Sequence, residues 1–323
     1  MNRIMIGDSF NPWHNLAVEK RLYRMDDEAC ILYIWQNANT VVIGRNQNAW
    51  KECDLAAMEK DGVRLARRES GGGAVFHDLG NINFTFITPA EVHDVHKQLQ
   101  VVQSAAAMFG IETEQSGRND LLISANGCKF SGNAFQKNAR TCLHHGTILI
   151  AADTAKAGKY LTPSVKKLQA KGVSSVRSRI CNLSSCNPEL TVPGMIEALQ
   201  KAFVQTYGEA EVMEMFAPDD AEIAEYEQTL SSWDWRVGKA PACTLQLENR
   251  FDWGEVELYL DVQHGVVEQA KVYSDAMDEE LVLLIAPAVT GCRAQAQSIA
   301  QALRGIGRSE TDELSAWMAQ QSI

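Results

Sequence analysis

One segment stands out from the rest of the chain: Arg67-Arg68-Glu69-Ser70-Gly71-Gly72-Gly73-Ala74-Val75-Phe76-His77-Asp78. Three consecutive glycines leave a stretch of backbone without side chains, and glycine tolerates the positive φ angles that a nest of N–H groups requires. The two adjacent arginines add charged, planar forks of the kind that bind phosphate or carboxylate. No Gly-Lys-Ser or Gly-Lys-Thr follows the glycines, so the segment is not a Walker loop. Taken alone, it indicates a phosphate-binding loop and a tight turn between two strands about equally.

The sequence around this segment predicts short strands with helices inserted among them. Strands are expected at the apolar runs Ile31–Trp35, Thr40–Ile43, Val63–Arg67, Leu121–Ser124, Cys128–Phe135 and Gly146–Ile150, and at Ile82 to Ile87, where apolar and polar residues alternate. Helices are expected at Asn11–Met25, Ala49–Lys60, Asp94–Phe109 and Pro193–Tyr207. Because this order lacks a regular strand–helix–strand alternation, it favours an α+β fold with a mixed sheet over a doubly wound sheet.

A second, smaller domain is expected at the C-terminal end. The regular pattern degrades between Ala217 and Pro241, which predicts a linker. Beyond it, an antiparallel meander is expected at Thr244–Leu247, Glu255–Val262 and Val266–Tyr273, followed by helices near Glu279–Ala288, Gln295–Arg304 and Glu310–Gln321. The sequence therefore predicts two domains, residues 1–236 and residues 237–323.

The composition excludes several classes of protein. Apolar residues make up 46% of the 323 residues, which is enough for a substantial core. The net charge of −11 argues against general nucleic-acid binding, which requires a basic surface. No apolar run approaches the length of a membrane helix, and the N-terminus lacks the pattern of a signal peptide. The eight cysteines form no CxxC pair, which indicates reduced thiols in a cytoplasmic protein rather than a zinc site.

A second signal lies in the segments 116–120 and 127–134. Asn119 and Asp120 offer hard oxygen atoms that can hold Mg²⁺ against phosphates. Lys129 lies among small residues in a predicted strand, where its ammonium can neutralise a substrate carboxylate and an α-phosphate together. The alternatives are a surface turn for Asn119-Asp120 and a solvated side chain for Lys129.

Two further segments leave their roles open. His144 and His145 are neighbours in a predicted strand, so their side chains should point to opposite faces and should not share a metal ion. One of them can hydrogen-bond within a site, or both can be satisfied core histidines. The basic segment 171–179 predicts either a docking strip or lid, or an ordinary polar loop.

Together these motifs resemble the lipoate–protein ligase A family. The likeness rests on the order of several segments, from the glycine-rich segment 67–78 with Asn81 behind it to the lysine motif Lys129-Phe130-Ser131-Gly132-Asn133-Ala134. The segments 116–121, 145–149 and 176–183 resemble it as well. The resemblance extends over nearly the whole chain, including the small C-terminal domain of the long bacterial form.

The resemblance implies a catalytic domain of the biotin/lipoate ligase type, which is similar to class II synthetase cores, with an accessory C-terminal domain. It implies that lipoate and ATP with Mg²⁺ give lipoyl-AMP, and that the lipoyl group then passes to a lysine of a carrier protein. The implied carriers are the lipoyl domains of 2-oxoacid dehydrogenase acyltransferase subunits and the glycine cleavage H protein. No tightly bound prosthetic group, nucleic acid or membrane is implied.

The same resemblance assigns roles to individual residues. The implied ATP contacts are Arg68, Gly73, Ala74, Val75, Phe76 and Lys129; the implied lipoate contacts are Lys129, Gly72 and His77; the implied Mg²⁺ contacts are Asp120 and Asn119. Lys129 is the implied catalytic residue. The sequence departs from close relatives at Gln136, where an arginine is common, and Lys137 or Arg140 are candidates to replace it.

Two alternatives to a ligase remain open at this stage. The first is an octanoyl or lipoyl transferase that forms an acyl-enzyme on a cysteine, for which Cys128, Cys142 and Cys181 are available. Strand alternation would aim Cys128 away from the pocket that Lys129 faces. The second is a non-catalytic protein that binds lipoyl-AMP or a lipoyl domain.

Overall fold

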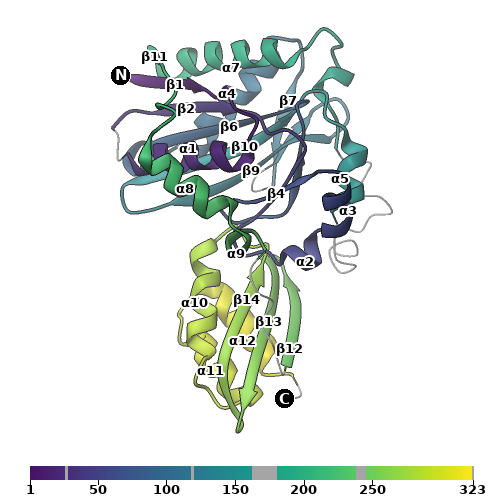
Figure 1. Ribbon diagram of the computed structural model, residues 1–323, viewed down its shortest axis with the longest axis vertical. Helices are drawn as coiled ribbons and strands as arrows, with labels where there is room; N and C mark the ends of the chain where they lie inside the picture. The colour runs from purple at the N-terminus through teal and green to yellow at the C-terminus, as the bar shows by residue number, and fades with distance from the viewer. Residues whose placement is uncertain (26–27, 118–119, 162–179, 238–244, 322–323) are drawn as a thin grey trace.

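An eight-stranded sheet forms the centre of the larger part of the molecule (Figure 1). The computed structural model describes residues 1–25, 28–117, 120–161, 180–237 and 245–321. The strands of this sheet are β1 (Asn2–Ile6), β2 (Ile31–Trp35), β6 (Asn81–Pro89), β7 (Thr113–Ser116), β8 (Asp120–Ile123), β9 (Cys128–Lys137), β10 (Thr141–Leu149) and β11 (Ala210–Met213). They lie in the order β11-β1-β2-β6-β10-β9-β8-β7. β1 pairs parallel with β11 and β2, and the remaining pairs are antiparallel, so the sheet is mixed as predicted.

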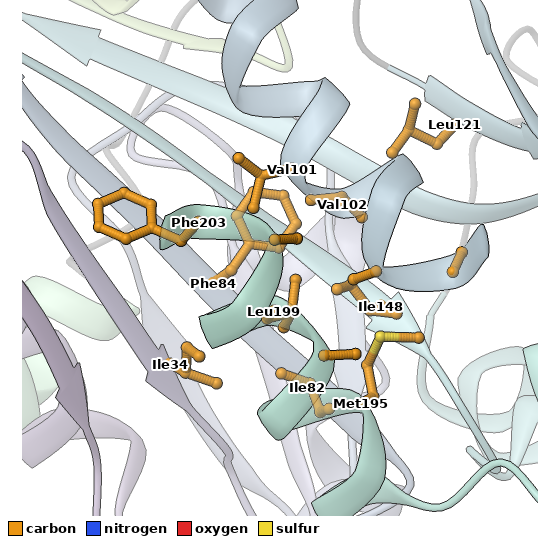
Figure 2. Packing of buried hydrophobic residues seen from close by; sticks show 14 of the residues in the cluster. Ile34, Ile82, Phe84, Val101, Val102, Leu121, Ile148, Met195, Leu199 and Phe203 are labelled. Carbon is orange, nitrogen blue, oxygen red and sulfur yellow. The ribbon is translucent and has the colours of Figure 1, made fainter. Parts of the chain in front are cut away.

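One face of this sheet packs against two helices, α4 (Val95–Ala107) and α7 (Val192–Tyr207). The alternation along β6 places Ile82, Phe84 and Phe86 on this face, where all three are fully buried. Figure 2 shows Phe84 between Val101 of α4 and Leu199 of α7. The expected strand with one apolar side is therefore confirmed, and this side supplies the main core.

The opposite face of the sheet packs against α1 (Pro12–Arg24) and α8 (Ala221–Ser231). Asn11 caps α1 by accepting a hydrogen bond from the Trp13 N–H, and Pro12 occupies the first turn, as the sequence predicts. This face carries the polar side of β6, including Thr85, and it is the face on which the candidate site lies.

A three-stranded sheet of β4 (Arg64–Arg67), β3 (Thr40–Ile43) and β5 (Val75–His77) borders the large one. The helices α2 (Ala49–Glu52), α3 (Leu55–Lys60) and α5 (Thr154–Tyr160) lie near it, and short 3-10 helices occur at Ala90–Val92 and Leu183–Ser185. The prediction of one helix over Ala49–Lys60 is wrong, because the side chain of Asp54 accepts from the Ala57 N–H and starts a new helix there.

The predicted linker over Ala217–Pro241 is also wrong for most of its length. The structure has α8 and then α9 (Trp233–Arg236) in this region. Asp220 and Ser232 cap the two helices, so their polar character marks helix starts rather than an extended connection. Residues 238–244 lie outside the described part of the chain, and the boundary between 236 and 237 stays a prediction.

The C-terminal part is a meander with helices on one face, as the sequence predicts (Figure 1). Its strands are β12 (Leu245–Phe251), β13 (Gly254–Gln263) and β14 (Val266–Ser274), and its helices are α10 (Glu279–Val289), α11 (Ala296–Arg304) and α12 (Ser309–Met318). His264 and Gly265 both have positive φ angles, 52° and 76°, which suit the tight turn between β13 and β14. Across the described ranges of both parts, no helix combines the length and apolarity needed to cross a bilayer.

Gly146 tests the packing between the large sheet and its main core. A Cβ added at Gly146 would lie 2.6 Å from Cζ of the buried Phe84, which has no room to move. We expect Gly146→Ala to lower the free energy of unfolding by about 1–3 kcal/mol, as overpacked core positions do. Gly305→Ala is the control, because its nearest neighbour would be 3.2 Å away. Equal denaturation midpoints for the two variants would contradict this prediction.

Candidate functional site

The glycine loop, residues 69–74, connects β4 to β5, the two outer strands of the small sheet. Gly72 has a φ of 90°, a conformation that side chains other than glycine rarely adopt. A Cβ added at Gly71 would lie 2.7 Å from the carbonyl oxygen of Met277. The two glycines are thus required for different reasons, one for the shape of the loop and the other for the close approach of a second backbone segment.

The Arg68 side chain hydrogen-bonds the glycine loop. Its Nε donates to Ser70 Oγ at 3.1 Å, and its Nη2 donates to the carbonyl oxygens of Gly71 at 2.7 Å and Gly73 at 2.9 Å. Its side chain is buried, and desolvation lowers its pKa to about 10, so the guanidinium remains charged at neutral pH. In this structure Arg68 binds the carbonyls of its own loop, and its contact with ATP stays a prediction.

Arg67 points to other carbonyls. It donates to the backbone oxygens of Trp235 at 2.8 Å, Arg236 at 2.9 Å, Gly44 at 3.1 Å, Arg45 at 2.8 Å and Gln47 at 2.6 Å. It thereby ties the end of α9 and the 44–47 turn to the start of the glycine loop. The expectation that both arginines offer their forks to a ligand is therefore not met by Arg67 in this structure, because protein carbonyls engage its guanidinium.

Lys129 and Asp120, which the sequence places in separate motifs, form an ion pair. Lys129 Nζ lies 2.7 Å from Asp120 Oδ1, and each side chain is about one-third exposed (35% and 34%). A Cβ added at Gly132 would lie 2.8 Å from Lys129 Nζ, so the lysine folds over this glycine. The ammonium is therefore within reach of solvent and of any ligand above β9.

The structure does not complete a metal site around Asp120. Among the described residues, no three His, Cys, Asp or Glu side chains gather where they could hold a metal ion. The Asp120 carboxylate faces the Lys129 ammonium instead. Asn119 and the basic segment 171–179 lie outside the described residues. The Mg²⁺ contacts at Asp120 and Asn119 stay predictions, and the donor set suits a metal ion that arrives already bound to phosphates.

The glycine loop and the lysine strand meet above the large sheet. A Cβ added at Gly72 would lie 3.9 Å from Cβ of Ala134, which follows Gly132 by two residues on β9. Residues two apart on a strand share a face, so Ala134 and Gly132 both face the loop. The two motifs quoted from the sequence therefore line one site.

His77 lies behind the loop as a neutral imidazole. It is 4% exposed, and burial, with Arg68 and His145 nearby, lowers its pKa to about 3. Its Nδ1 lies 3.1 Å from Asn37 Nδ2, and its Nε2 has no hydrogen-bond partner among the described residues. A buried ring nitrogen without a partner suits a polar ligand group, but lipoate binding at His77 and Gly72 stays a prediction.

The remaining candidates on β5 expose little side chain. Phe76 is buried against Tyr160, with ring centroids 5.7 Å apart, so only its backbone is placed to meet a nucleotide. Gly73, Ala74 and Val75 are partly buried at the end of the loop. Their predicted ATP contacts would therefore be made mainly by backbone groups.

The neighbouring histidines of β10 face opposite sides, as predicted. His144 hydrogen-bonds Gln98 and Asn133 on the side of α4. His145 bonds Ser70 at 2.7 Å and Glu19 at 2.8 Å on the side of the site. The sequence analysis missed Glu19, although a glutamate three residues after Leu16 on the apolar face of α1 was an available signal.

A segment of the C-terminal part, residues 274–279, covers the glycine loop. The carbonyl of Ala276 accepts from the Gly72 N–H at 3.1 Å, and the Ser274 N–H donates to the carbonyl of Asn46 at 2.6 Å. Lys51 on α2 pairs with Glu257 of β13 at 2.9 Å. A backbone carbonyl thus occupies the N–H donor that the sequence assigned to a ligand-binding nest.

Glu279 lies at the same contact and is 8% exposed. Its pKa is raised from 4.5 to about 7, chiefly by desolvation; Arg45 opposes this rise, and Glu69 adds to it. Glu280 and Asp278 on its own segment raise it further. The contact between the two parts of the molecule therefore contains a carboxyl group that is protonated more readily than an exposed glutamate.

Two of the cysteines considered as nucleophiles, Cys142 and Cys181, are poorly ionised. Burial raises the pKa of Cys142, and burial together with Cys128 raises that of Cys181 to about 11. A raised pKa reduces the thiolate fraction, which is the nucleophilic form. Seven cysteines lie in the described residues, and none of these forms a disulfide.

Two family models match the chain. The lipoyl protein ligase A/B catalytic domain matches residues 11–204, and the bacterial lipoate protein ligase C-terminus matches residues 240–318. The first contains the glycine loop and Lys129, and the second contains the segment that covers the loop.

Solved structures give the same picture. LipL1 of P. falciparum, in complex with lipoate, is 29% identical with a TM-score of 0.87, covering 99% of this chain and 100% of its own. A bipartite lipoate protein ligase of Thermoplasma acidophilum, studied with its E2 lipoyl domain, is 25% identical with a TM-score of 0.65, covering 76% of this chain and 99% of its own. A lipoate-protein ligase A bound with ATP shares the fold at 22% identity and a TM-score of 0.62, covering 73% of this chain and 98% of its own.

Glu279 gives the stability of the chain a specific pH dependence. Its pKa is about 7 in the folded protein and about 4.5 when exposed, so its favourable contribution is full below pH 4.5 and is lost as pH rises through 7. We expect wild type to lose stability relative to Glu279→Gln over this interval, measured as the difference in urea midpoints. Glu268→Gln, an exposed carboxylate on β14, controls for the loss of one charge without removing a group that shifts the Glu279 pKa. A difference that stays constant from pH 4.5 to 8 would reject this assignment.

Proposed function

The chain belongs to the lipoyl protein ligase A/B family, and we propose that it is an AMP-forming lipoate–protein ligase. In the proposed reaction, lipoate and ATP with Mg²⁺ give lipoyl-AMP and pyrophosphate. The ε-amine of a carrier lysine then attacks the acyl carbon of lipoyl-AMP, and AMP leaves. The products are the lipoylated carrier and AMP, with one proton released.

The observation that carries this proposal is the meeting of the two motifs. Gly72 and Ala134 lie face to face, and Lys129 folds over Gly132 on the same strand. The glycine loop and the strand that carries the Lys129 ammonium thereby border one space. This arrangement suits a reaction between two anions, a carboxylate and an α-phosphate, that otherwise repel each other.

Each motif has its own part in the first step. The glycine loop supplies N–H donors for the phosphates, from Gly72 and from the backbone of residues 73–76. Arg68, which hydrogen-bonds the loop carbonyls, adds a positive charge nearby. Lys129 neutralises the carboxylate and the developing charge on the α-phosphate. No protein nucleophile is required, because AMP serves as the leaving group.

The second step fixes the class of partner. The acceptor is proposed to be a lysine on the lipoyl domains of 2-oxoacid dehydrogenase acyltransferase subunits and on the glycine cleavage H protein. The T. acidophilum relative, described with its E2 lipoyl domain, supports the first of these. The P. falciparum relative binds lipoate, which supports the proposed acid. The protein is proposed to act in the cytoplasm, with its cysteines reduced.

We expect the site to discriminate only weakly between acids of different chain length. A buried CH₂ group contributes about 0.8 kcal/mol, so acids that differ by one carbon should differ in binding by only a few-fold. Lipoate-dependent exchange of pyrophosphate into ATP tests the proposal directly, with lipoate, octanoate and biotin assayed in parallel. Exchange with lipoate supports it, whereas tight lipoate binding without exchange supports a non-catalytic binding protein.

A cysteine acyl-enzyme is the less favoured mechanism. The raised pKa values of Cys142 and Cys181 leave these thiols poorly ionised at neutral pH. Trapping a thioester on the protein in the absence of ATP would nevertheless establish the transferase in place of the ligase.

Lys129→Ala is the sharpest variant for the first step. We expect a loss of exchange activity of at least about 100-fold, since the ammonium proposed to neutralise the carboxylate is removed. The fold should persist, because an ion pair that is one-third exposed contributes little to stability.

Lys201→Ala is the matched control for this loss. Lys201 is an exposed lysine on α7 whose partner is Glu197 of the same helix. The Lys201→Ala variant should exchange pyrophosphate at the wild-type rate. Near-normal exchange by Lys129→Ala would remove Lys129 from the mechanism, while the family assignment would stand.

A further inference from the structure

Two thiols that are distant in the sequence lie together at the start of β9. Cys128 is the first residue of this strand, and Cys181 directly follows a parallel bridge between Lys129 and Ile180. The Cys181 N–H donates to the carbonyl oxygen of Lys129 at 3.0 Å, which fixes the two backbone segments against each other. The proposed reaction uses neither thiol, although both flank its lysine.

The bridge places both thiols on the face opposite to the Lys129 side chain. Lys129 and Ile180 are bridge partners, so their side chains share one face. Side chains alternate along an extended segment, so Cys128 and Cys181 both point to the other face. The two thiols are hydrogen-bonded there, which agrees with this geometry.

The hydrogen bond gives the two thiols different roles. Desolvation, and then the bond to Cys128, raise the pKa of Cys181 to about 11. Cys181 therefore keeps its hydrogen and donates it, and the sulfur of Cys128 accepts. Both side chains are partly exposed, whereas Cys30 and Cys53 are buried, so a small oxidant can reach this pair in the folded protein.

The segment after the bridge holds Cys181 in place. The side chain of Asn182 donates to the carbonyl oxygen of Ala152 at 2.9 Å and accepts from its N–H at 3.0 Å. Leu183 is fully buried in the main core, and Cys181 packs against the same core. A disulfide forms only between cysteines that are close and point toward each other, and these two thiols are held in that arrangement.

We propose that Cys128 and Cys181 form a reversible oxidation site, at which a hydroperoxide joins the two thiols in a disulfide and stops the first step of the proposed reaction. The Cys128 thiol loses its proton, and its sulfur breaks the O–O bond to give a sulfenic acid and an alcohol, or water from hydrogen peroxide. The Cys181 sulfur then attacks the sulfenic sulfur, and its hydrogen leaves with the hydroxide as water. Two thiols and one hydroperoxide thus give one disulfide, one alcohol and one water.

The disulfide would act on Lys129 through the backbone. Cys128 precedes Lys129, and Cys181 already bonds its carbonyl oxygen, so the cross-link constrains the backbone on both sides of the lysine. It also fixes Ile180, which is 38% exposed, beside the Lys129 side chain. In the proposed reaction the ammonium that now pairs with Asp120 has to meet the carboxylate of the acid. A misplacement of about 1 Å at such a group can cost about 100-fold in rate.

Treatment of the full chain with hydrogen peroxide tests the proposal. We expect the loss of two thiols, and a peptide that joins Cys128 to Cys181 when the protein is digested without reductant. Lipoate-dependent exchange of pyrophosphate should fall at least about tenfold and return when dithiothreitol reduces the bond. The melting temperature of the oxidised protein should not fall, because a cross-link constrains the unfolded chain.

Serine variants separate this pair from the other cysteines. Cys128→Ser and Cys181→Ser should exchange pyrophosphate at the wild-type rate and should keep that rate after the same treatment. Cys292→Ser is the matched control, because Cys292 is also partly exposed but lies in the C-terminal part of the chain. This variant should lose and regain activity like wild type.

Four outcomes would overturn the proposal. A disulfide between Cys181 and the exposed Cys186, which also influences Cys181 electrostatically, would make that pair the oxidation site. A loss of activity that dithiothreitol does not restore would indicate oxidation beyond the disulfide. A lower melting temperature would indicate damage to the fold. A Cys128–Cys181 disulfide with full exchange would show that the bond does not affect Lys129.

The effect on exchange rests on the proposed function, whereas the disulfide does not. If the untreated chain shows no exchange with lipoate, the proposed function fails, and the peptide map still decides whether Cys128 and Cys181 are the oxidation site. The two failures are therefore distinguishable.

Discussion

Two buried guanidinium groups, which form no ion pair with a carboxylate of the described residues, determine the local structure of the site. A buried charge is costly unless its hydrogen bonds are made, and Arg67 and Arg68 make theirs almost entirely with backbone carbonyls. Consecutive residues of an extended segment point to opposite sides. Arg67 therefore hydrogen-bonds the 44–47 turn and the end of α9, while Arg68 hydrogen-bonds the glycine loop. Carbonyls carry no net charge, so each guanidinium keeps its formal positive charge close to the loop. A positive charge can favour a phosphate even where the guanidinium does not touch it.

The alternation along the central strands divides the large sheet between stability and chemistry. On β6, the residues Ile82, Phe84 and Phe86 face α4 and α7 in the main core. Thr85 faces the other way, and its hydroxyl donates a hydrogen bond to the buried carboxylate of Glu19. His144 and His145 repeat this division on β10, with one histidine in each face. A shift of one residue in the β6–β10 register would therefore exchange core and site residues together. Burial of the apolar residues in the core thus also fixes the positions of Thr85 and His145.

The sequence predicted what local patterns encode. The α+β class, the C-terminal meander, the opposite orientation of the two histidines and the meeting of the glycine and lysine motifs follow from periodicity, from short motifs and from the family resemblance. The direction of Arg67 and Arg68 did not follow, because the carbonyls that bind Arg67 come partly from residues 235–236, far along the chain. Glu19 was missed for the same reason: it lies 126 residues from His145, and only the folded sheet brings them together. The helices between Ala217 and Arg236 were missed because their capping residues, Asp220 and Ser232, are also common in linkers.

The contact at Gly72 links the two parts of the molecule to the proposed chemistry. Its N–H donates to the carbonyl of Ala276, and a Cβ added at Gly72 would lie 3.1 Å from the sulfur of Met277, so the C-terminal segment occupies the space above the loop. One N–H cannot donate fully to a carbonyl and to a phosphate oxygen at the same time. A phosphate oxygen that accepted from this N–H would therefore compete for it with the carbonyl of Ala276. Glu279 adds a second term to this balance, because its buried carboxyl favours docking in its neutral form and resists it once ionised. Gly71 and Gly72 thus allow a second backbone segment to approach the loop closely, and the proposed function requires the same property for the approach of a nucleotide.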